Sequence, residues 1–243
     1  MAHSALARCL LAVTLVAAAP ASMAGPPEPR LGGVWMGFVT LWSSGSYEPQ
    51  PRWKTFFDDG TMFADLPPEG LAAFDRAASR AARRGTNYWQ TYTMSGSTGV
   101  SRSAETAASW KLVLVKPGEL KIDSDVFHRC ASVDGLRLDG AWTSYGQDDP
   151  ALDRLPVGQR PVIHFTREGR FVDDGLFATF LKSGGDDRPG SGRYELKDFT
   201  LILRYDDGRV RQEAFTGLLG ADPAVQDGKI YIRRSVMTKR ATR

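Results

Sequence analysis

The sequence predicts an all-β protein of two antiparallel β-meander barrels in tandem, with one helix inserted in the first. The main observation is an internal repeat, which opens with Leu31–Trp35 (LGGVW) and, 107 positions later, with Leu138–Trp142 (LDGAW). Each copy continues in the same order with a phenylalanine, an acidic-Gly turn, a second aromatic, an aromatic-rich strand and a Leu-x-Leu strand. Because such repeats mark repeated structural units, we expect two similar units joined near Ser132–Gly135.

Turns and alternation support the β assignment. In Phe199–Tyr205 (FTLILRY), the residues Phe199, Leu201, Leu203 and Tyr205 share one face, as expected of a strand with one buried side. Pairs ending in glycine separate the apolar runs: Asp59-Gly60, Pro117-Gly118, Asp134-Gly135, Glu168-Gly169, Asp207-Gly208 and Asp227-Gly228. Such pairs accept the positive φ of tight hairpin turns, so they predict short strands in a meander that packs as a sandwich or closes as a barrel.

One segment departs from this pattern and predicts a helix over residues 68–84. Pro67-Pro68-Glu69 suits a first helical turn, and Gly85 is typical of a helix end. One face of this helix would carry Arg76, Arg80, Arg83 and Arg84. That face is either a site for an anionic surface or ligand, or the solvated side of a helix that covers the barrel. The matching stretch of the second copy, 177–188, is interpreted as a strand and a flexible loop.

The N-terminus has the pattern of a secretory signal peptide. Arg8 precedes an apolar run, 10–19, which is too short to cross a bilayer, and Ser22 and Ala24 fit the small positions before a signal-peptidase site. The expected organisation is a signal peptide (1–24), a first barrel (25–132) and a second barrel (133–243). We therefore expect a periplasmic or secreted protein. No later stretch is long and apolar enough for a membrane helix, so no integral membrane association is expected.

Charge and cysteine content bound the function. The chain has 31 basic and 28 acidic residues, and removal of residues 1–24 takes away one arginine and no acid, which leaves 30 against 28. A nearly neutral chain gives no reason to expect nucleic acid as a partner. Only Cys130 would remain in the mature chain, so no intramolecular disulfide is possible. Its thiol is either buried or available for pairing, and we expect it to be buried.

The opening motif of each copy, Gly33-Val34-Trp35 and Gly140-Ala141-Trp142, resembles the Gly-x-Trp motif of lipocalins and other calycin barrels. The copies are also similar to lipocalin-like repeats of uncharacterised exported bacterial proteins. The resemblance implies that each tryptophan packs across one barrel end, with an arginine of the last strand over its indole. Arg129 would be that arginine in the first copy, and Arg233 or Arg234 in the second. The resemblance implies no known chemistry.

Candidate catalytic groups are few. His128 and Cys130 could share one face of a strand, and His164 could be a third metal ligand, although a structural zinc usually has four. Acid pairs occur at Asp148-Asp149, Asp173-Asp174, Asp186-Asp187 and Asp206-Asp207. Paired carboxylates can perform hydrolysis or bind calcium, but aspartate is also a common turn former. We interpret both sets as structural and expect neither a metal nor another cofactor.

The aromatic side chains favour a binding function. Eight-stranded barrels are either filled by side chains or hold one small ligand. The aromatics expected to contact such a ligand are Trp35, Phe63, Phe74, Trp89, Trp142, Phe171, Tyr194 and Tyr205. A specific site is expected first at residues 70–85 or at the interface between the two copies.

Three function classes stay open, and the sequence does not define an oligomeric state. The first is an exported, non-catalytic binding protein that holds a small apolar or aromatic ligand in a barrel. The second is a structural or interaction protein of the cell envelope with filled barrels. The third is a hydrolase or isomerase that uses His128 or an acid pair. An open apolar cavity would favour the first class, and filled barrels would favour the second.

Overall fold

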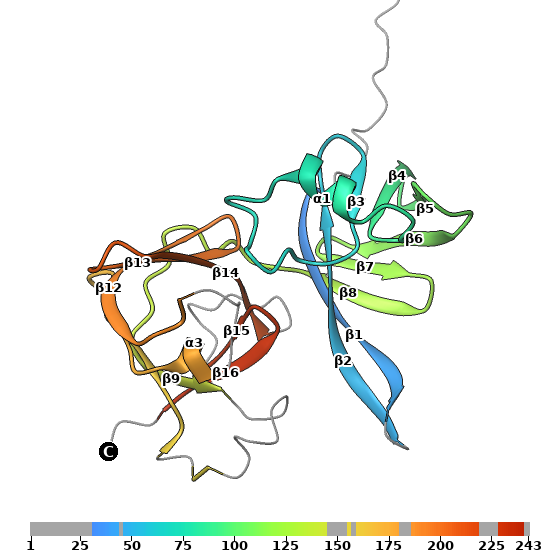
Figure 1. Cartoon of the computed structure of the whole chain (residues 1–243). Helices are drawn as coiled ribbons and strands as arrows, with labels where there is room; N and C mark the ends of the chain where they lie inside the picture. Colours follow the sequence, from blue (N-terminus) through green and yellow to red (C-terminus); the bar gives the residue numbers. More distant parts are fainter. Residues whose placement is uncertain are drawn as a thin grey trace, which may run out of the picture.

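The computed structural model describes residues 31–43, 46–144, 155–156, 159–179, 186–218 and 228–240. The chain forms two closed barrels of eight antiparallel strands each, so the predicted all-β fold is confirmed (Figure 1). The predicted signal peptide, residues 1–24, lies outside the described residues. Among the helices of the described chain, none is long and apolar enough to cross a membrane.

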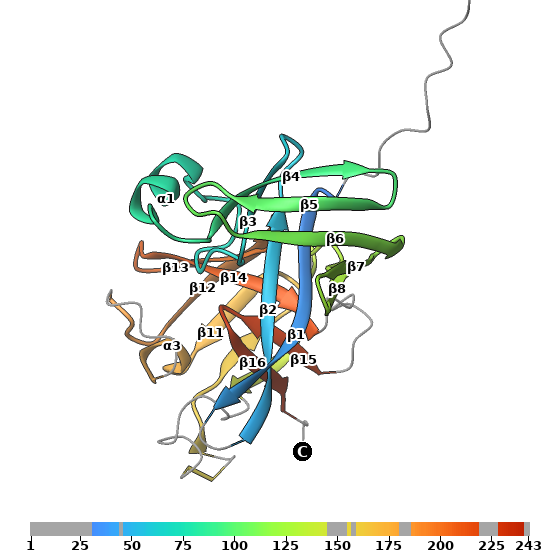
Figure 2. The ribbon, with the colours of Figure 1, turned by 90° about the vertical axis from the view of Figure 1, so that its right-hand side faces the viewer.

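The first barrel is a meander in which each strand pairs with the next. Its elements are β1 (Gly33–Ser43), β2 (Ser46–Phe56), β3 (Thr61–Phe63), α1 (Arg76–Ala82), β4 (Trp89–Ser95), β5 (Thr98–Ser103), β6 (Ser109–Lys116), β7 (Glu119–Ile122) and β8 (Asp125–Arg129). The barrel closes because β8 pairs with β1. The β1 and β2 strands form a long hairpin, which Figure 2 shows in front of the second barrel.

The second barrel repeats this arrangement. Its elements are β9 (Gly140–Ser144), β10 (Ile163–Phe165), β11 (Arg170–Asp173), α3 (Leu176–Thr179), β12 (Gly190–Lys197), β13 (Thr200–Tyr205), β14 (Val210–Gly217), β15 (Lys229–Ile232) and β16 (Ser235–Lys239). Here β16 pairs with β9 and closes the barrel. The two halves of the sequence repeat therefore fold into units of the same topology.

The repeated Gly-x-Trp motif has the same local structure in both barrels. The glycine of each motif has a positive φ, of 119° in the first barrel and 89° in the second. The indole of Trp35 donates a hydrogen bond of 2.7 Å to the carbonyl of Leu31, and that of Trp142 donates one of 3.2 Å to the carbonyl of Asp139. Each buried tryptophan thus ties the chain that enters a barrel to the first strand of that barrel.

The cation near the second tryptophan differs from the prediction. Arg129 lies opposite Trp35 in the closing strand pair of the first barrel. The equivalent position opposite Trp142 is held by Lys239. The prediction of Arg233 or Arg234 for that position is wrong, because Arg233–Arg234 form the turn between β15 and β16, away from the closing register.

The predicted helix of the first barrel is present but shorter than residues 68–84. It begins after Asp75, whose side chain caps it by accepting a 2.9 Å hydrogen bond from the amide of Ala78. Aspartate is among the best N-cap residues, so this cap determines the start of α1 in place of the prolines. The preceding Pro67–Gly70 forms a turn closed by a 2.9 Å bond from the Gly70 amide to the Pro67 carbonyl.

The second barrel also contains a short helix, contrary to the strand and loop predicted for residues 177–188. The buried carboxylate of Asp173 accepts hydrogen bonds from the amides of Gly175 and Leu176 and so starts α3. Leu176 and Phe177 are fully buried in the barrel core. Capping and burial together therefore stabilise a single helical turn that periodicity does not reveal. Residues 180–185 lie outside the described part of the chain.

Side chains fill both barrel interiors. The buried core of the first consists of Leu31, Trp35, Phe56, Met62, Met94, Leu112, Leu120, Ile122 and Phe127. The buried core of the second consists of Val133, Leu138, Trp142, Ile163, Phe165, Phe171, Leu176, Phe177, Tyr194, Leu196, Leu201, Leu203, Tyr205, Phe215, Ile230, Ile232 and Met237. Packing of this kind is typical of small barrels whose interior is a core.

A third buried cluster joins the two barrels. Its members are Val34, Met36, Trp53, Leu66, Cys130, Ala214 and Tyr231. The first five belong to the first barrel and its linker, and the last two belong to the second. The rings of Trp53 and Tyr231 meet edge to face, with centroids 5.3 Å apart. The expectation of a buried Cys130 is confirmed, and burial raises the pKa of its thiol to about 12.

Backbone hydrogen bonds fix the same interface. The segment between β3 and α1 lies along β13 and β14, where the amide of Ala214 donates to the Pro68 carbonyl at 2.7 Å. The Leu71 amide donates to the carbonyl of Asp198 at 3.1 Å, and the Ala72 amide to Oγ1 of Thr200 at 2.9 Å. Directional bonds of this kind set the relative position of the two barrels, which apolar packing alone would leave free to slide.

Gly70 lies at the closest approach of the barrels and provides a test. Its φ is +78°, and a Cβ there would come within 2.8 Å of the backbone Cα of Thr200, whereas Gly85 has φ +73° with nothing within 4 Å. Both alanine substitutions carry a strain of about 1–2 kcal/mol, and only Gly70→Ala adds overpacking of about 1–3 kcal/mol. We expect urea denaturation to show a larger loss of stability for Gly70→Ala. Equal losses for the two variants would contradict the interface.

Candidate functional site

A cleft of about 340 Å³ opens where the two barrels meet. Its lining residues are Pro51, Arg52, Trp53, Ala64, Asp65, Thr86, Asn87, Tyr88 and Arg234. All but the last come from the first barrel, which contributes the β2 strand, the end of β3 and the segment before β4. We call this site the inter-barrel cleft. It lies at one of the two places where a specific site is expected, the other being residues 70–85.

Trp53 forms the apolar wall of the inter-barrel cleft. It is only 2% exposed, and its ring is held by the edge-to-face contact with Tyr231 of the second barrel. Its indole Nε1 is buried and has no hydrogen-bond partner among the described residues. A buried unpaired N–H donor costs stability, and in native proteins such groups are rare. The contact between the barrels therefore contains an unsatisfied polar group beside the cleft.

An ion pair crosses the same cleft. Asp65, which follows β3 and is buried, forms a salt bridge with Arg234 in the β15–β16 turn. The carboxylate of Asp65 also accepts a 2.9 Å hydrogen bond from the amide of Leu66, and its carbonyl accepts one of 2.8 Å from Thr55. Arg233, with φ 62°, places the turn so that Arg234 reaches the first barrel. The cleft thus depends on residues of both barrels.

Arg52 is the other charged group of the cleft. Its guanidinium donates hydrogen bonds to the carbonyl of Pro51 and to Oε1 of Gln50, both at 3.4 Å. These distances are longer than the usual 2.7–3.2 Å of a good N–H···O bond. Among the described residues, no carboxylate forms a salt bridge with Arg52.

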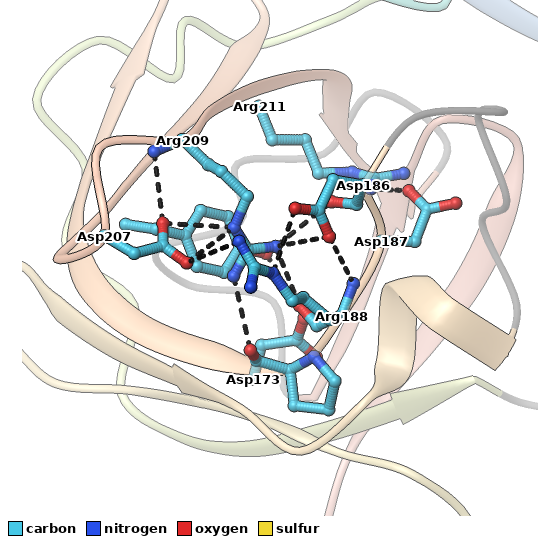
Figure 3. Close-up of polar contacts among 9 residues, drawn as sticks. Asp173, Asp186, Asp187, Arg188, Asp207, Arg209 and Arg211 are labelled. Carbon is cyan, nitrogen blue, oxygen red and sulfur yellow. Dashed lines mark hydrogen bonds and ion pairs between the residues drawn. The ribbon is translucent and has the colours of Figure 1, made fainter.

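A second polar cluster lies at one end of the second barrel (Figure 3). Arg211 pairs with Asp187, and Arg209 pairs with Asp207 at 2.8 Å. Arg211 also pairs with Glu213 at 2.6 Å. Burial raises the pKa of Glu213, although the nearby arginines act in the opposite direction. Each acid in the cluster is matched by an arginine. We interpret the cluster as a charge network that stabilises the barrel end.

Arginines of this network also lie over aromatic rings of the core. The guanidinium of Arg211 is 4.3 Å from the ring centre of Phe177, and that of Arg209 is 4.1 Å from that of Tyr205. Such cation–π contacts cover the end of the apolar core with charged groups. The Tyr205 hydroxyl donates to the carboxylate of Asp173 at 3.2 Å. Core and network are therefore one packed unit, which favours a structural role.

The eight aromatics predicted to bind a ligand do not form one site. Trp35 lies in the core of the first barrel, and Trp142, Phe171, Tyr194 and Tyr205 lie in the core of the second. Phe63, Phe74 and Trp89 pack against one another outside the first barrel, beside α1. None of the eight lines the inter-barrel cleft, and Phe63 and Phe74 line a separate hollow of about 320 Å³ next to α1.

The residues that do line the cleft were not selected from the sequence. Trp53 is not among the eight aromatics predicted to bind a ligand, and Arg234 is predicted only as an alternative partner for Trp142. The missed signal is that Val34, Met36 and Phe38 alternate with Trp35, so that β1 is apolar on both faces. A strand of that kind is covered on both sides, which points to an interface beyond its own barrel.

The arginine face of α1 is packed onto aromatic rings. The guanidinium groups of Arg76, Arg80 and Arg83 lie 4.1–4.5 Å from the ring centres of Phe57, Trp89 and Tyr88, respectively. Arg76 also pairs with Asp59 at 2.6 Å. Hydrogen bonds from Thr61, together with the one from Arg76, lower the pKa of Asp59 to about 2. The arginine face of α1 is therefore in contact with solvent and also makes cation–π contacts with aromatic rings of the first barrel.

The candidate catalytic and metal-binding groups lie apart from one another in the structure. His128 is exposed, Cys130 is buried between the barrels, and His164 pairs with Asp174 at 3.4 Å on the surface. Within the described residues, no three acidic, histidine or cysteine side chains are grouped as metal ligands. The acid pair Asp148-Asp149 lies outside those residues.

Comparisons with protein-family models, curated proteins and solved structures give no match for this chain.

The pH dependence of stability at Asp173 tests the interpretation that the polar cluster of the second barrel is structural. Burial raises the pKa of Asp173 above its usual 3.8. At a pH between 3.8 and the raised value, the folded protein therefore retains a proton that the unfolded chain has lost. The free energy of unfolding therefore falls as pH rises from 3.8 through the raised folded pKa. Asp173→Asn removes this titration while its amide oxygen can still accept from Leu176, so its stability relative to wild type should increase between about pH 4 and 7.

Chemical denaturation of both proteins across that pH range measures the difference. Asp173→Ala is the matched variant, because it leaves the buried amides of Gly175 and Leu176 without their acceptor. It should lose about 1–3 kcal/mol per unsatisfied group at every pH. If the free energy of unfolding of Asp173→Asn changes with pH in the same way as that of wild type between about pH 4 and 7, the Asp173 carboxyl has no raised pKa.

Proposed function

We propose that this protein is an exported, non-catalytic binding protein that holds a small aromatic ligand in the inter-barrel cleft. The observation that carries the proposal is the cleft itself, with Trp53 and Tyr88 as apolar walls and Arg52, Asp65 and Arg234 as charged groups. Ligand sites are typically concave and present a few precisely placed polar groups. The volume of about 340 Å³ is that of a site for a small molecule.

The proposal places the ligand between the barrels because both barrel interiors are occupied. Each copy resembles lipocalin-like barrels in its Gly-x-Trp motif. In such a barrel, a ligand would enter the interior. Here the buried Trp35 and Phe127 occupy the first interior, and Phe171 and Phe215 occupy the second. Export rests on the sequence pattern of residues 1–24.

A second candidate function is that of an envelope protein that acts only through its surface. The filled barrels favour it, as does the exposed part of the arginine face of α1. The two candidates differ in one measurable property. A binding protein carries or accepts a small molecule in the inter-barrel cleft, and a surface protein does not.

Native mass spectrometry of the purified mature protein tests for a bound small molecule. The neutral fluorescent dye N-phenyl-1-naphthylamine is a suitable probe, because its emission rises on entry into an apolar site and Trp53 can transfer energy to it. We expect saturable binding with energy transfer from tryptophan. A ligand-free mass together with no saturable dye binding would favour the surface protein.

Ala64→Leu tests the location of the site. Ala64 lines the cleft, so three additional carbon atoms reduce its volume. We expect dye affinity to fall at least about tenfold, which corresponds to about 1.4 kcal/mol. Ala107→Leu is the matched control, since Ala107 is exposed in the turn between β5 and β6. If both variants bind the dye like wild type, the ligand site lies elsewhere.

A further inference from the structure

We infer that the ligand of the inter-barrel cleft is a small aromatic anion, whose negatively charged oxygen group is bound by Arg52. This inference rests on the proposed function and specifies the ligand class of the same site. It follows from the polar groups of the cleft walls. The side chains there offer hydrogen-bond donors in excess, while their acceptors are already in use.

The acceptors of the cleft are occupied by the protein. Oδ1 of Asp65 accepts from the Leu66 amide, and Oδ2 accepts from Arg234. Oδ1 of Asn87 accepts a 2.7 Å hydrogen bond from Thr106, and its carbonyl accepts one of 2.9 Å from Gln90. A ligand that donates hydrogen bonds would therefore share acceptors that already have a partner.

The donors are less well satisfied. Arg52 makes only two long hydrogen bonds, both at 3.4 Å, to oxygen atoms of adjacent residues. The side-chain NH₂ of the exposed Asn87 forms no hydrogen bond among the residues that the structure describes, while its oxygen is bonded to Thr106. A ligand rich in acceptors would take the place of water at these donors.

The charges of the cleft also favour an anionic ligand. Arg52 and Arg234 contribute two positive charges to the cleft, and Asp65 contributes one negative charge that is paired with Arg234. The remaining charge is that of Arg52. A guanidinium binds carboxylate or sulfonate oxygens through two parallel N–H groups, and a charge-assisted bond in a partly enclosed site is stronger than a neutral one.

The test compares two dyes of the same ring skeleton. The probe 1-anilinonaphthalene-8-sulfonate carries a sulfonate, and N-phenyl-1-naphthylamine lacks it. Both are titrated into the full mature protein and into two variants, Arg52→Gln and Arg193→Gln. Arg193 is exposed on β12, away from the cleft, so the control removes the same charge without changing the site.

We expect wild type to bind the sulfonate dye more tightly than the neutral dye. Arg52→Gln should weaken the sulfonate dye at least about tenfold, because a hydrogen bond to a charged group is lost, and should leave the neutral dye within about twofold, the scatter expected when no contact changes. Arg193→Gln should leave both affinities unchanged. Circular dichroism of each variant establishes that it is folded.

The outcomes separate the inference from the function on which it rests. Equal affinities for the two dyes in wild type, or equal losses in Arg52→Gln and Arg193→Gln, would overturn the anion inference. In that case, binding of the neutral dye that Ala64→Leu weakens would still support a binding site in the cleft. No saturable binding of either dye would overturn both.

Discussion

The contact between the two barrels is the constraint on which the rest of this structure depends. Each barrel closes upon itself, and among the described strands none of one barrel pairs with a strand of the other. The join is made by the segment before α1, whose Pro68 carbonyl and Leu71 amide bond to the second barrel, and by the edge-to-face contact of Trp53 and Tyr231. Directional bonds and apolar packing together therefore fix an arrangement that neither barrel specifies alone.

This constraint explains where a site can form. Because both interiors are cores, the barrels themselves offer packed side chains. Two convex bodies that touch along a line leave a hollow beside that line, and the residues that border it need not satisfy one another. Arg52, which makes two long hydrogen bonds, lines this hollow, and the buried indole of Trp53 lies at the contact beside it.

The sequence predicted the barrels better than their junction, for a physical reason. Alternation in Phe199–Tyr205 and the Gly-x-Trp repeat depend on neighbouring residues, so they can be recognised in one chain segment at a time. The interface depends on residues such as Asp65 and Arg234, which are 169 positions apart and belong to different copies. Helix α3 was missed because its stability comes from the cap of Asp173 and from burial, which periodicity does not record.

Hydrogen exchange at the amides of Leu71 and Ala214 tests the central claim most directly, because both donate across the barrel contact. The account predicts that these amides exchange as slowly as those inside β13, and more slowly still when N-phenyl-1-naphthylamine saturates the protein. Exchange as fast as that of the exposed turn at Gly85, unchanged by the dye while the barrel strands stay protected, would show that the barrels do not hold a fixed cleft between them.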